Sequence, residues 1–177
     1  MFNKTLISLD GSKLSEEIVP HCIGYCLGSG SQPILLKVFT AHITIPPPES
    51  THVFTIGPDS KPDQIHTTDI GKSTTLEPKA GLQLREIERE QGEAKSYLEN
   101  LAALFRAKDL KVETVTLEGE VNETILNYAN QHKVSLIALT THGNGGLKHG
   151  ILGRTAQYIL KESVIPVWIF KPSGKIA

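Results

Sequence analysis

The chain has 177 residues, of which 39% are hydrophobic and 21% are charged, and its formal net charge is −1. This length suits one ordinary hydrophobic core, so we expect a single domain over residues 1–177. The near-neutral charge gives no reason to expect a nucleic acid or an anionic membrane surface as a partner. No apolar run approaches the roughly 18 residues of a membrane span, and residues 1–10 lack a signal-peptide pattern. We therefore expect a cytoplasmic protein.

The first forty residues alternate between strand and helix patterns. Residues 4–9 (Lys-Thr-Leu-Ile-Ser-Leu) indicate a short buried strand, and residues 10–12 (Asp-Gly-Ser) are a turn sequence that can also cap a helix. Apolar residues then follow at helical spacing over 14–26, until the glycines of 28–30 end the pattern. Residues 33–39 are almost entirely apolar, which is typical of a strand buried on both faces of a parallel sheet.

Residues 41–81 interrupt the alternation. They are rich in proline, serine and threonine and show no sustained period. This composition predicts an inserted loop or a disordered arm.

The alternation resumes after the insert. The patterns predict a long helix over 82–108, an edge or half-buried strand over 111–117, a helix over 121–132, a strand over 135–140, a helix over 153–162 and a strand over 164–170. Strict alternation predicts an α/β fold with an open five-stranded parallel sheet and helices on both faces.

Two loops are the candidate ligand loops, because ligands bind beyond the carboxyl ends of the strands in such sheets. One is 10–12, after the first strand, and the other is the glycine-rich 141–150, after the fourth. If the strand order is 3-2-1-4-5, the first and fourth strands are neighbours and both loops face one crevice.

The chemistry of the second loop suits a phosphate. Glycines let backbone amides approach an anion, and the following helix turns its positive end toward the same place. Lys148, His149 and Arg154 add cationic side chains. Glycine content alone is explained at least as well by a flexible turn with solvated basic residues, and neither the Walker nor the dinucleotide pattern is present.

Together these segments resemble the universal stress protein family. That family carries Gly-x-x-Gly, nine residues and Gly-Ser or Gly-Thr after its fourth strand. Here 140–143 (Thr-Thr-His-Gly) is followed by nine residues and then by Gly153 and Arg154. Residues 9–12 resemble the first-strand motif, and 165–167 resemble the entry to the last strand. The resemblance covers about residues 1–40 and 83–172.

The resemblance implies a Rossmann-like, adenine nucleotide α-hydrolase-like fold with strand order 3-2-1-4-5. It also implies a regulatory protein that forms homodimers and, in one subgroup, binds ATP. Bound ATP or AMP would lie in the crevice between the loops after strands 1 and 4, and Mg²⁺ would accompany ATP.

Carried over residue by residue, the resemblance implies a nucleotide site. Asp10 and the backbone of Val38 would lie by the adenine, and Thr140 would lie near the ribose. The amides of Gly143 and Gly153 would face the phosphates. The remaining implied contacts are His142, Gly146, Arg154 and Thr155.

Two departures from the family pattern leave alternatives open. Thr140 stands where the pattern has its first glycine, and Arg154 replaces a small hydroxyl residue. An arginine can hold phosphate through paired donors, or it can fill the empty pocket. One alternative is therefore a dimeric interaction module that binds no nucleotide and uses 41–81 as an arm. Another is a slow ATPase in which Asp10 holds a magnesium-bound water, although no nucleophile–base pair is recognisable and Asp10 is equally explained as a turn former.

The remaining notable residues are expected to be structural. Cys22 and Cys26 lie one helical turn apart and fit small core positions, and the scattered histidines show no metal-ligand spacing. The last strand ends in a strongly apolar stretch, which favours a homodimer through its edge over burial beneath a helix of the same chain. This expected interface consists of Val167, Trp168, Ile169 and Phe170.

Overall fold

The computed structural model describes residues 3–40, 79–141 and 152–173. All five strands in these ranges are parallel and form one sheet in the order β3-β2-β1-β4-β5, so the predicted fold class and strand order are confirmed. The elements are β1 (Lys4–Ser8), α1 (Lys13–Glu16), α2 (Val19–Ser29), β2 (Gln32–Phe39), α3 (Lys79–Arg106), β3 (Glu113–Glu118), α4 (Val121–Gln131), β4 (Leu136–Thr140), α5 (Arg154–Glu162) and β5 (Val167–Phe170).

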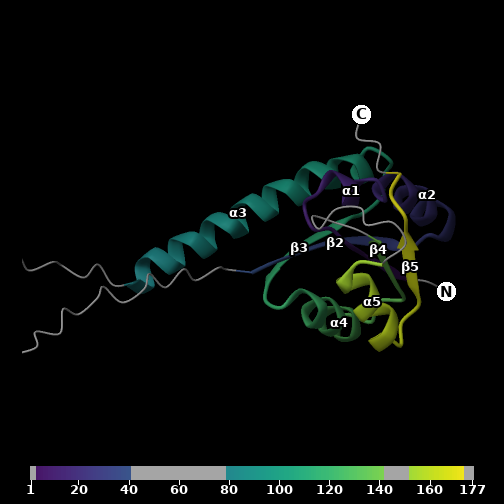
Figure 1. Cartoon of the computed structure of the whole chain (residues 1–177). Helices are drawn as coiled ribbons and strands as arrows, with labels where there is room; N and C mark the ends of the chain where they lie inside the picture. The colour runs from purple at the N-terminus through teal and green to yellow at the C-terminus, as the bar shows by residue number, and fades with distance from the viewer. Residues whose placement is uncertain (1–2, 41–78, 142–151, 174–177) are drawn as a thin grey trace, which may run out of the picture.

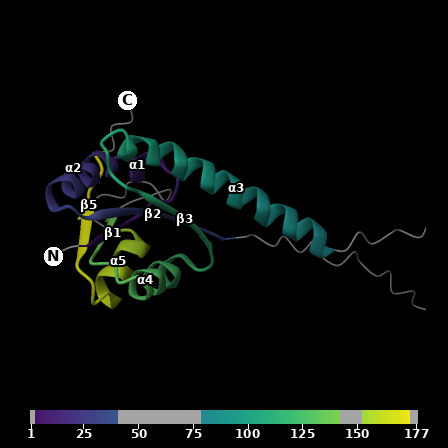
Figure 2. The same cartoon turned by 180° about the vertical axis from the view of Figure 1, so that it is seen from behind.

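Helices cover both faces of the sheet, α1, α2 and α3 on one side and α4 and α5 on the other (Figures 1 and 2). Alternate residues of each central strand point to opposite faces, which divides the core in two. Leu6, Ile34 and Ile137 pack in the cluster with α4 and α5. Their neighbours in sequence, Ile7, Leu35 and Ala138, pack in the cluster with α2 and α3.

Strand β1 lies at the centre of the sheet and pairs with β2 on one side and β4 on the other. At its start, the Lys4 N–H donates to Ser135 Oγ at 3.0 Å, and Ser135 Oγ donates to the Lys4 carbonyl, also at 3.0 Å. Residues 5–7 are completely buried. The near-continuous apolar character of the central strands follows from this burial on both faces.

The helical pattern over 14–26 forms two helices rather than one. The break between α1 and α2 falls at residues 17–18, just before Pro20. Proline has no N–H to donate to the carbonyl of Glu16, and its ring disfavours helix in the residues before it. The glycine stop is confirmed, because Gly30 adopts a left-handed φ of 69° and its N–H closes α2 on the Cys26 carbonyl.

Both cysteines are buried core residues, as predicted. Burial raises the pKa of the Cys22 thiol far above its ordinary value, and it raises the pKa of Cys26 to about 11. A thiol that stays protonated in this way is a poor nucleophile and a poor metal ligand.

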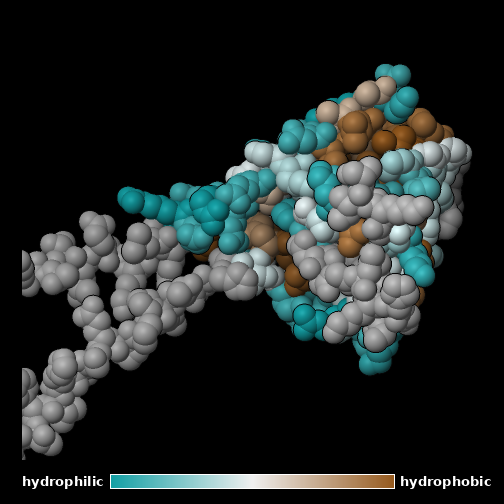
Figure 3. Space-filling model, turned by 45° about the horizontal axis from the view of Figure 1, so that its top comes forward, coloured by the Kyte–Doolittle hydropathy of each residue, from teal (hydrophilic) through white to brown (hydrophobic). Residues whose placement is uncertain are grey.

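Helix α3 has two halves with different surroundings. It runs about 42 Å, and its N-terminal half projects beyond the sheet in both views (Figures 1 and 2). From Ala94 onward, Ala94, Leu98, Leu101, Ala102 and Phe105 are buried and Leu104 is 50% exposed, whereas in the other half Leu84 is 57% exposed. In Figure 3 the projecting half is mostly hydrophilic, and hydrophobic residues gather over the body. Within the projecting half, Arg89 bonds Glu86 and Glu93 of the same helix, both at 2.6 Å.

The helix also begins earlier than predicted. Its backbone is helical from Lys79, so residues 79–81 belong to α3 and not to the expected insert. Residues 41–78, the rest of that insert, lie outside the described residues.

We predict that α3 contributes to stability almost entirely through its C-terminal half. Phe105→Ala should lower the free energy of unfolding by about 3–5 kcal/mol, because Phe105 is completely buried. Leu84→Ala, the matched change on the projecting half, should cost less than about 0.5 kcal/mol. Urea denaturation of both variants measures the difference, and similar losses would contradict the division of the helix.

Candidate functional site

The carboxyl edge of the sheet is stepped, because β1 ends before β2. The Leu9 N–H donates to the Leu36 carbonyl at 2.9 Å, and the chain then turns away at residues 10–12. β2 continues to Phe39, beyond the Ser8–Leu36 pair, whereas β4 ends at Thr140, which the Ile7–Ala138 pairing places opposite Leu9. We use the word crevice for the place at the carboxyl end of β1, between the ends of β2 and β4, where the sequence predicts a ligand.

Backbone polar groups of β2 face the crevice. In a parallel strand, successive residues direct their N–H and C=O groups to opposite neighbours. Leu36 faces β1 through its bond with Leu9, and Phe39 faces β3, since its carbonyl accepts from the Gly119 N–H at 3.1 Å. Val38 therefore directs its N–H and C=O toward the β1 side, above the point where β1 has ended.

The same alternation places Thr140 on the opposite wall. The N–H groups of Ile137 and Thr141 donate to carbonyls of the β5 segment, those of Pro166 at 3.0 Å and Phe170 at 2.8 Å. Ile137, Leu139 and Thr141 thus face β5, and Ala138 and Thr140, the residues between these, direct their backbone N–H and C=O groups toward β1. The predicted neighbours Val38 and Thr140 thus flank one crevice.

Asp10 lies in the turn at the base of the crevice. Its Oδ1 accepts hydrogen bonds from the backbone N–H of Ser12 at 2.9 Å and from Ser12 Oγ at 2.6 Å. Ser12 in turn caps α1 by accepting from the Ser15 N–H at 3.1 Å. Gly11, between them, has a φ of +93°, a conformation that disfavours residues with a Cβ. The carboxylate of Asp10 therefore stabilises the turn after β1 and also lies at the carboxyl end of β1, as the sequence predicted.

The N-terminus of α5 lies beside the end of β4. The Gly153 N–H donates to the Thr141 carbonyl at 2.7 Å, which ties the helix start to the strand end. Gly153 occupies the N-cap position and provides no side-chain cap, so the first turn of α5 carries the helix's partial positive charge. Arg154 is exposed in this turn, and Thr155 is partly buried.

The structure therefore brings together one part of the predicted site. Asp10, Val38 and Thr140 surround the crevice, and Gly153, Arg154 and Thr155 follow from Thr141 at its edge. The other predicted contacts, His142, Gly143 and Gly146, lie outside the described residues.

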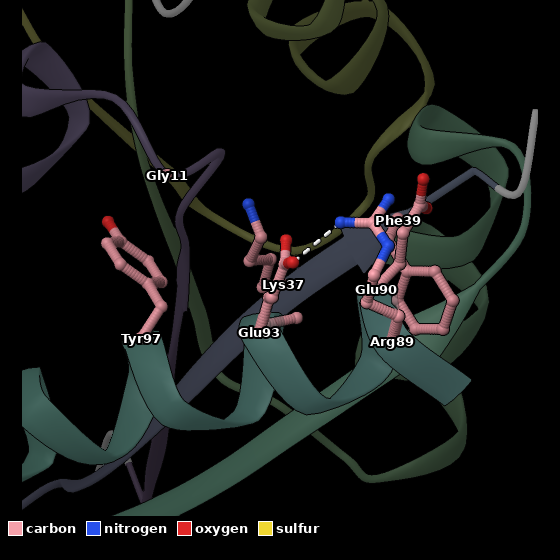
Figure 4. Close-up of a pocket in the computed structure, with 8 residues that line it drawn as sticks. Gly11, Lys37, Phe39, Arg89, Glu90, Glu93 and Tyr97 are labelled. Carbon is pink, nitrogen blue, oxygen red and sulfur yellow. Dashed lines mark hydrogen bonds and ion pairs between the residues drawn. The ribbon is translucent and has the colours of Figure 1, made fainter. Parts of the chain in front are cut away.

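A cavity of about 340 Å³ lies next to the crevice on the α3 side of the sheet (Figure 4). It lies between the Gly11 turn, the end of β2 and the point where α3 leaves the body. The lining residues are Gly11, Lys37, Phe39, Arg89, Glu90, Glu93, Ala94 and Tyr97. Two cations and two carboxylates among them leave its formal charge balanced.

Lys37 is hydrogen-bonded to the Asp10 turn. Its Nζ donates to the Asp10 carbonyl at 2.8 Å and lies 5.3 Å from the centroid of the Tyr97 ring. Partial burial lowers the pKa of Lys37, while the charges of Asp10 and Glu90 oppose this shift. Burial raises the pKa of Tyr97 to about 12, so the phenol beside it stays neutral at physiological pH.

This cavity was not predicted from the sequence. One signal was present, because Lys37 interrupts the apolar run of 33–39. A charged residue in a strand that is otherwise buried on both faces indicates a polar environment near the strand end. The α3 side of the cavity carried no comparable signal.

Related sequences were found along nearly the whole chain. Universal stress protein YxiE of Bacillus subtilis is 28% identical over 172 residues, which are 97% of this chain and 100% of that protein. Universal stress protein MJ0531 of Methanocaldococcus jannaschii is 24% identical over 176 residues, 99% of this chain and 85% of that protein.

Solved structures share the fold. Protein MJ0577 of Methanocaldococcus jannaschii superposes with a TM-score of 0.72 at 20% identity, covering 99% of each chain. A universal stress protein solved in complex with cAMP gives 0.59 at 13% identity, covering 97% of this chain and 98% of its own. A family member from Arabidopsis thaliana with AMP bound gives 0.56 at 12% identity, covering 97% and 93%.

The fold and its crevice define a doubly wound parallel α/β protein. A sequence model of the universal stress protein family matches residues 63–171. The chain belongs to the universal stress protein family, and the resemblance drawn from the motifs is confirmed. Among the helices of residues 3–40, 79–141 and 152–173, none has the length and apolar character needed to cross a bilayer.

We predict that Gly11 cannot be replaced without loss of stability. Gly11→Ala should lower the free energy of unfolding by about 1–2 kcal/mol, because its φ is positive and a Cβ would lie 2.6 Å from Lys37 Nζ. Gly24→Ala is the matched control. Gly24 lies inside α2, where a Cβ meets nothing within 4 Å, so this substitution should raise the free energy of unfolding by about 0.5–1 kcal/mol. Denaturation curves that move in the same direction would contradict this assignment of the turn.

Proposed function

We propose that this protein is a regulatory member of its family that binds an adenine nucleotide, ATP or AMP, in the crevice. The observation that carries the proposal is that Val38, Thr140 and Asp10 lie together around the carboxyl end of β1. A backbone donor and acceptor on one residue are suited to the edge of a nucleobase. Relatives of the same fold with bound cAMP and AMP support the choice of an adenine nucleotide.

The distribution of charge supports one orientation of the ligand. The β2 end of the crevice adjoins a cavity whose two cations and two carboxylates balance, which suits a neutral base. The β4 end adjoins the first turn of α5 and the exposed Arg154, which suit an anion. We infer that the base lies by Asp10 and Val38, the ribose near Thr140 and the phosphates near Gly153, Arg154 and Thr155.

Three sequence-predicted contacts complete the proposed site, namely His142, Gly143 and Gly146. Mg²⁺ would enter with ATP as its counterion. The ATPase alternative gains little from the geometry, since Asp10 Oδ1 already accepts two hydrogen bonds from Ser12.

Nucleotide titration tests the proposal and distinguishes it from a ligand-free interaction module. ATP and AMP should raise the melting temperature and give saturable heats by calorimetry. Arg154→Ala should weaken ATP binding about tenfold and leave adenosine binding unchanged, because only the phosphates lose a charged donor. Lys161→Ala, at the other end of α5, is the control. Tighter ATP binding by Arg154→Ala would instead identify the arginine as an obstruction, and no binding of either nucleotide at millimolar concentration would refute the proposal.

We also propose that two copies of the chain pair through β5. This strand is an edge of the sheet, and all four of its residues are partly buried. Trp168 contacts Tyr25 with ring centroids 5.6 Å apart, and Phe170 contacts His21 at 4.7 Å. An apolar edge strand that has no neighbour on its outer side among the described strands is suited to pairing with a second strand.

Sedimentation tests this assembly. The wild-type protein should sediment as a dimer and Val167→Lys as a monomer, because the new charge would lie beside the paired edge. Thr116→Lys on β3, the opposite edge, should leave the dimer intact. Circular dichroism checks that both variants are folded. A wild-type monomer, or a dimer unaffected by Val167→Lys, would exclude β5 as the interface.

A further inference from the structure

One side chain connects β2 to the turn that carries Asp10. Lys37 extends from β2 on the α3 side, toward the Gly11 turn (Figure 4). Its Nζ donates a hydrogen bond to the Asp10 carbonyl at 2.8 Å. This hydrogen bond joins residues 27 positions apart in the sequence. The neighbouring Tyr97 ring, 5.3 Å from the ammonium, adds a cation–π contact. The contact crosses the base of the crevice.

Two groups of Asp10, the backbone carbonyl and the side-chain carboxylate, therefore accept hydrogen bonds from different residues. Lys37 binds the backbone carbonyl, and Ser12 binds the carboxylate through its N–H and its hydroxyl. The two groups lie on either side of one Cα. Holding both fixes the plane of the Asp10–Gly11 peptide and the direction of the side chain together. If the carbonyl were released, the peptide could rotate, and the Ser12 bonds would have to follow or break.

Gly11 makes room for this contact. A Cβ at position 11 would lie 2.6 Å from Lys37 Nζ and 3.8 Å from its Cε. The ammonium therefore occupies the space that any larger residue would need. The glycine serves two purposes, since it supplies the positive φ and admits the lysine.

We propose that Lys37 is a positioning residue of the ligand site, which fixes the Asp10 turn in the orientation that the nucleotide requires. The inference rests on the proposed function for its ligand, but its structural part concerns the turn alone. Lys37 acts through the Asp10 peptide and makes no contact with the nucleotide in this account. Partial burial strengthens the bond, because a charged donor competes less with water there.

Hydrogen exchange on the protein without ligand tests the structural part. Lys37→Met keeps most of the apolar stem and removes the donor. The Ser12 amide, which is bonded to Asp10 Oδ1, should exchange about tenfold faster, as expected for the loss of one charge-assisted hydrogen bond. The Leu9 amide, bonded to β2 just before the turn, should not change. Lys95→Met, an exposed lysine on α3, is the matched control and should affect neither amide.

AMP affinity, measured by calorimetry, tests the functional part. Lys37→Met should weaken AMP binding about tenfold, whereas Lys37→Arg, which keeps a cationic donor, should recover most of the loss. Gly11→Ala displaces the same ammonium, so its effect on affinity should not add to that of Lys37→Met in the double variant. Additive losses would mean that the two residues act separately and would overturn the proposal.

The remaining outcomes separate this inference from the proposed function. Unchanged Ser12 exchange in Lys37→Met refutes the positioning role, whatever the affinities are. Faster exchange with wild-type AMP affinity also refutes it, because the turn would then not serve the site. If the wild-type protein binds no AMP, the proposed function fails, and Ser12 exchange alone decides whether Lys37 holds the turn. Lys37→Gln, too short to reach the carbonyl, replaces Lys37→Met if that variant does not fold.

Discussion

The early end of β1 is the constraint on which the site depends. A parallel sheet normally uses the backbone groups of each strand to bind its neighbours, and little polar backbone is left over in its interior. Here the chain leaves the central position at Asp10, while β2 continues to Phe39. The backbone groups of Val38 are therefore directed to the space above the end of β1. These backbone groups are held rigidly, because they belong to a strand that is largely buried.

The turn that ends β1 is maintained by interactions from several elements. Ser12 ties the Asp10 carboxylate to the start of α1, and Lys37 ties its carbonyl to β2. Tyr97 brings α3 against the same lysine. The cavity beside this turn is lined by the part of α3 where the helix leaves the body, so packing of that helix and the shape of the crevice are linked through a few side chains.

Much of this architecture was predictable from local pattern. Apolar runs and helical spacing located every strand and helix of the described chain, and the motifs after strands 1 and 4 identified the family. Two predictions from local pattern were wrong. The helical spacing over 14–26 predicted one helix, but the chain forms two, with a break just before Pro20. The composition of 41–81 predicted an insert, but residues 79–81 already belong to α3. The contact between Lys37 and Asp10 was not predictable, because it depends on how the ends of β1 and β2 are staggered and on the face of the sheet from which the Lys37 side chain extends. Sequence spacing carries no information about either.

The central position of β1 has a consequence for how the chain acquires its structure. β1 is synthesised well before one of its two partners, because β4 follows about 130 positions later, as the Lys4–Ser135 contact illustrates. Until that strand leaves the ribosome, β1, whose residues 5–7 are completely buried in the folded protein, has an open edge. Such an edge invites pairing with other nascent chains, and wholly parallel sheets close slowly because their contacts are distant. This topology therefore requires that the β1 edge stays unpaired with other chains until β4 has been synthesised.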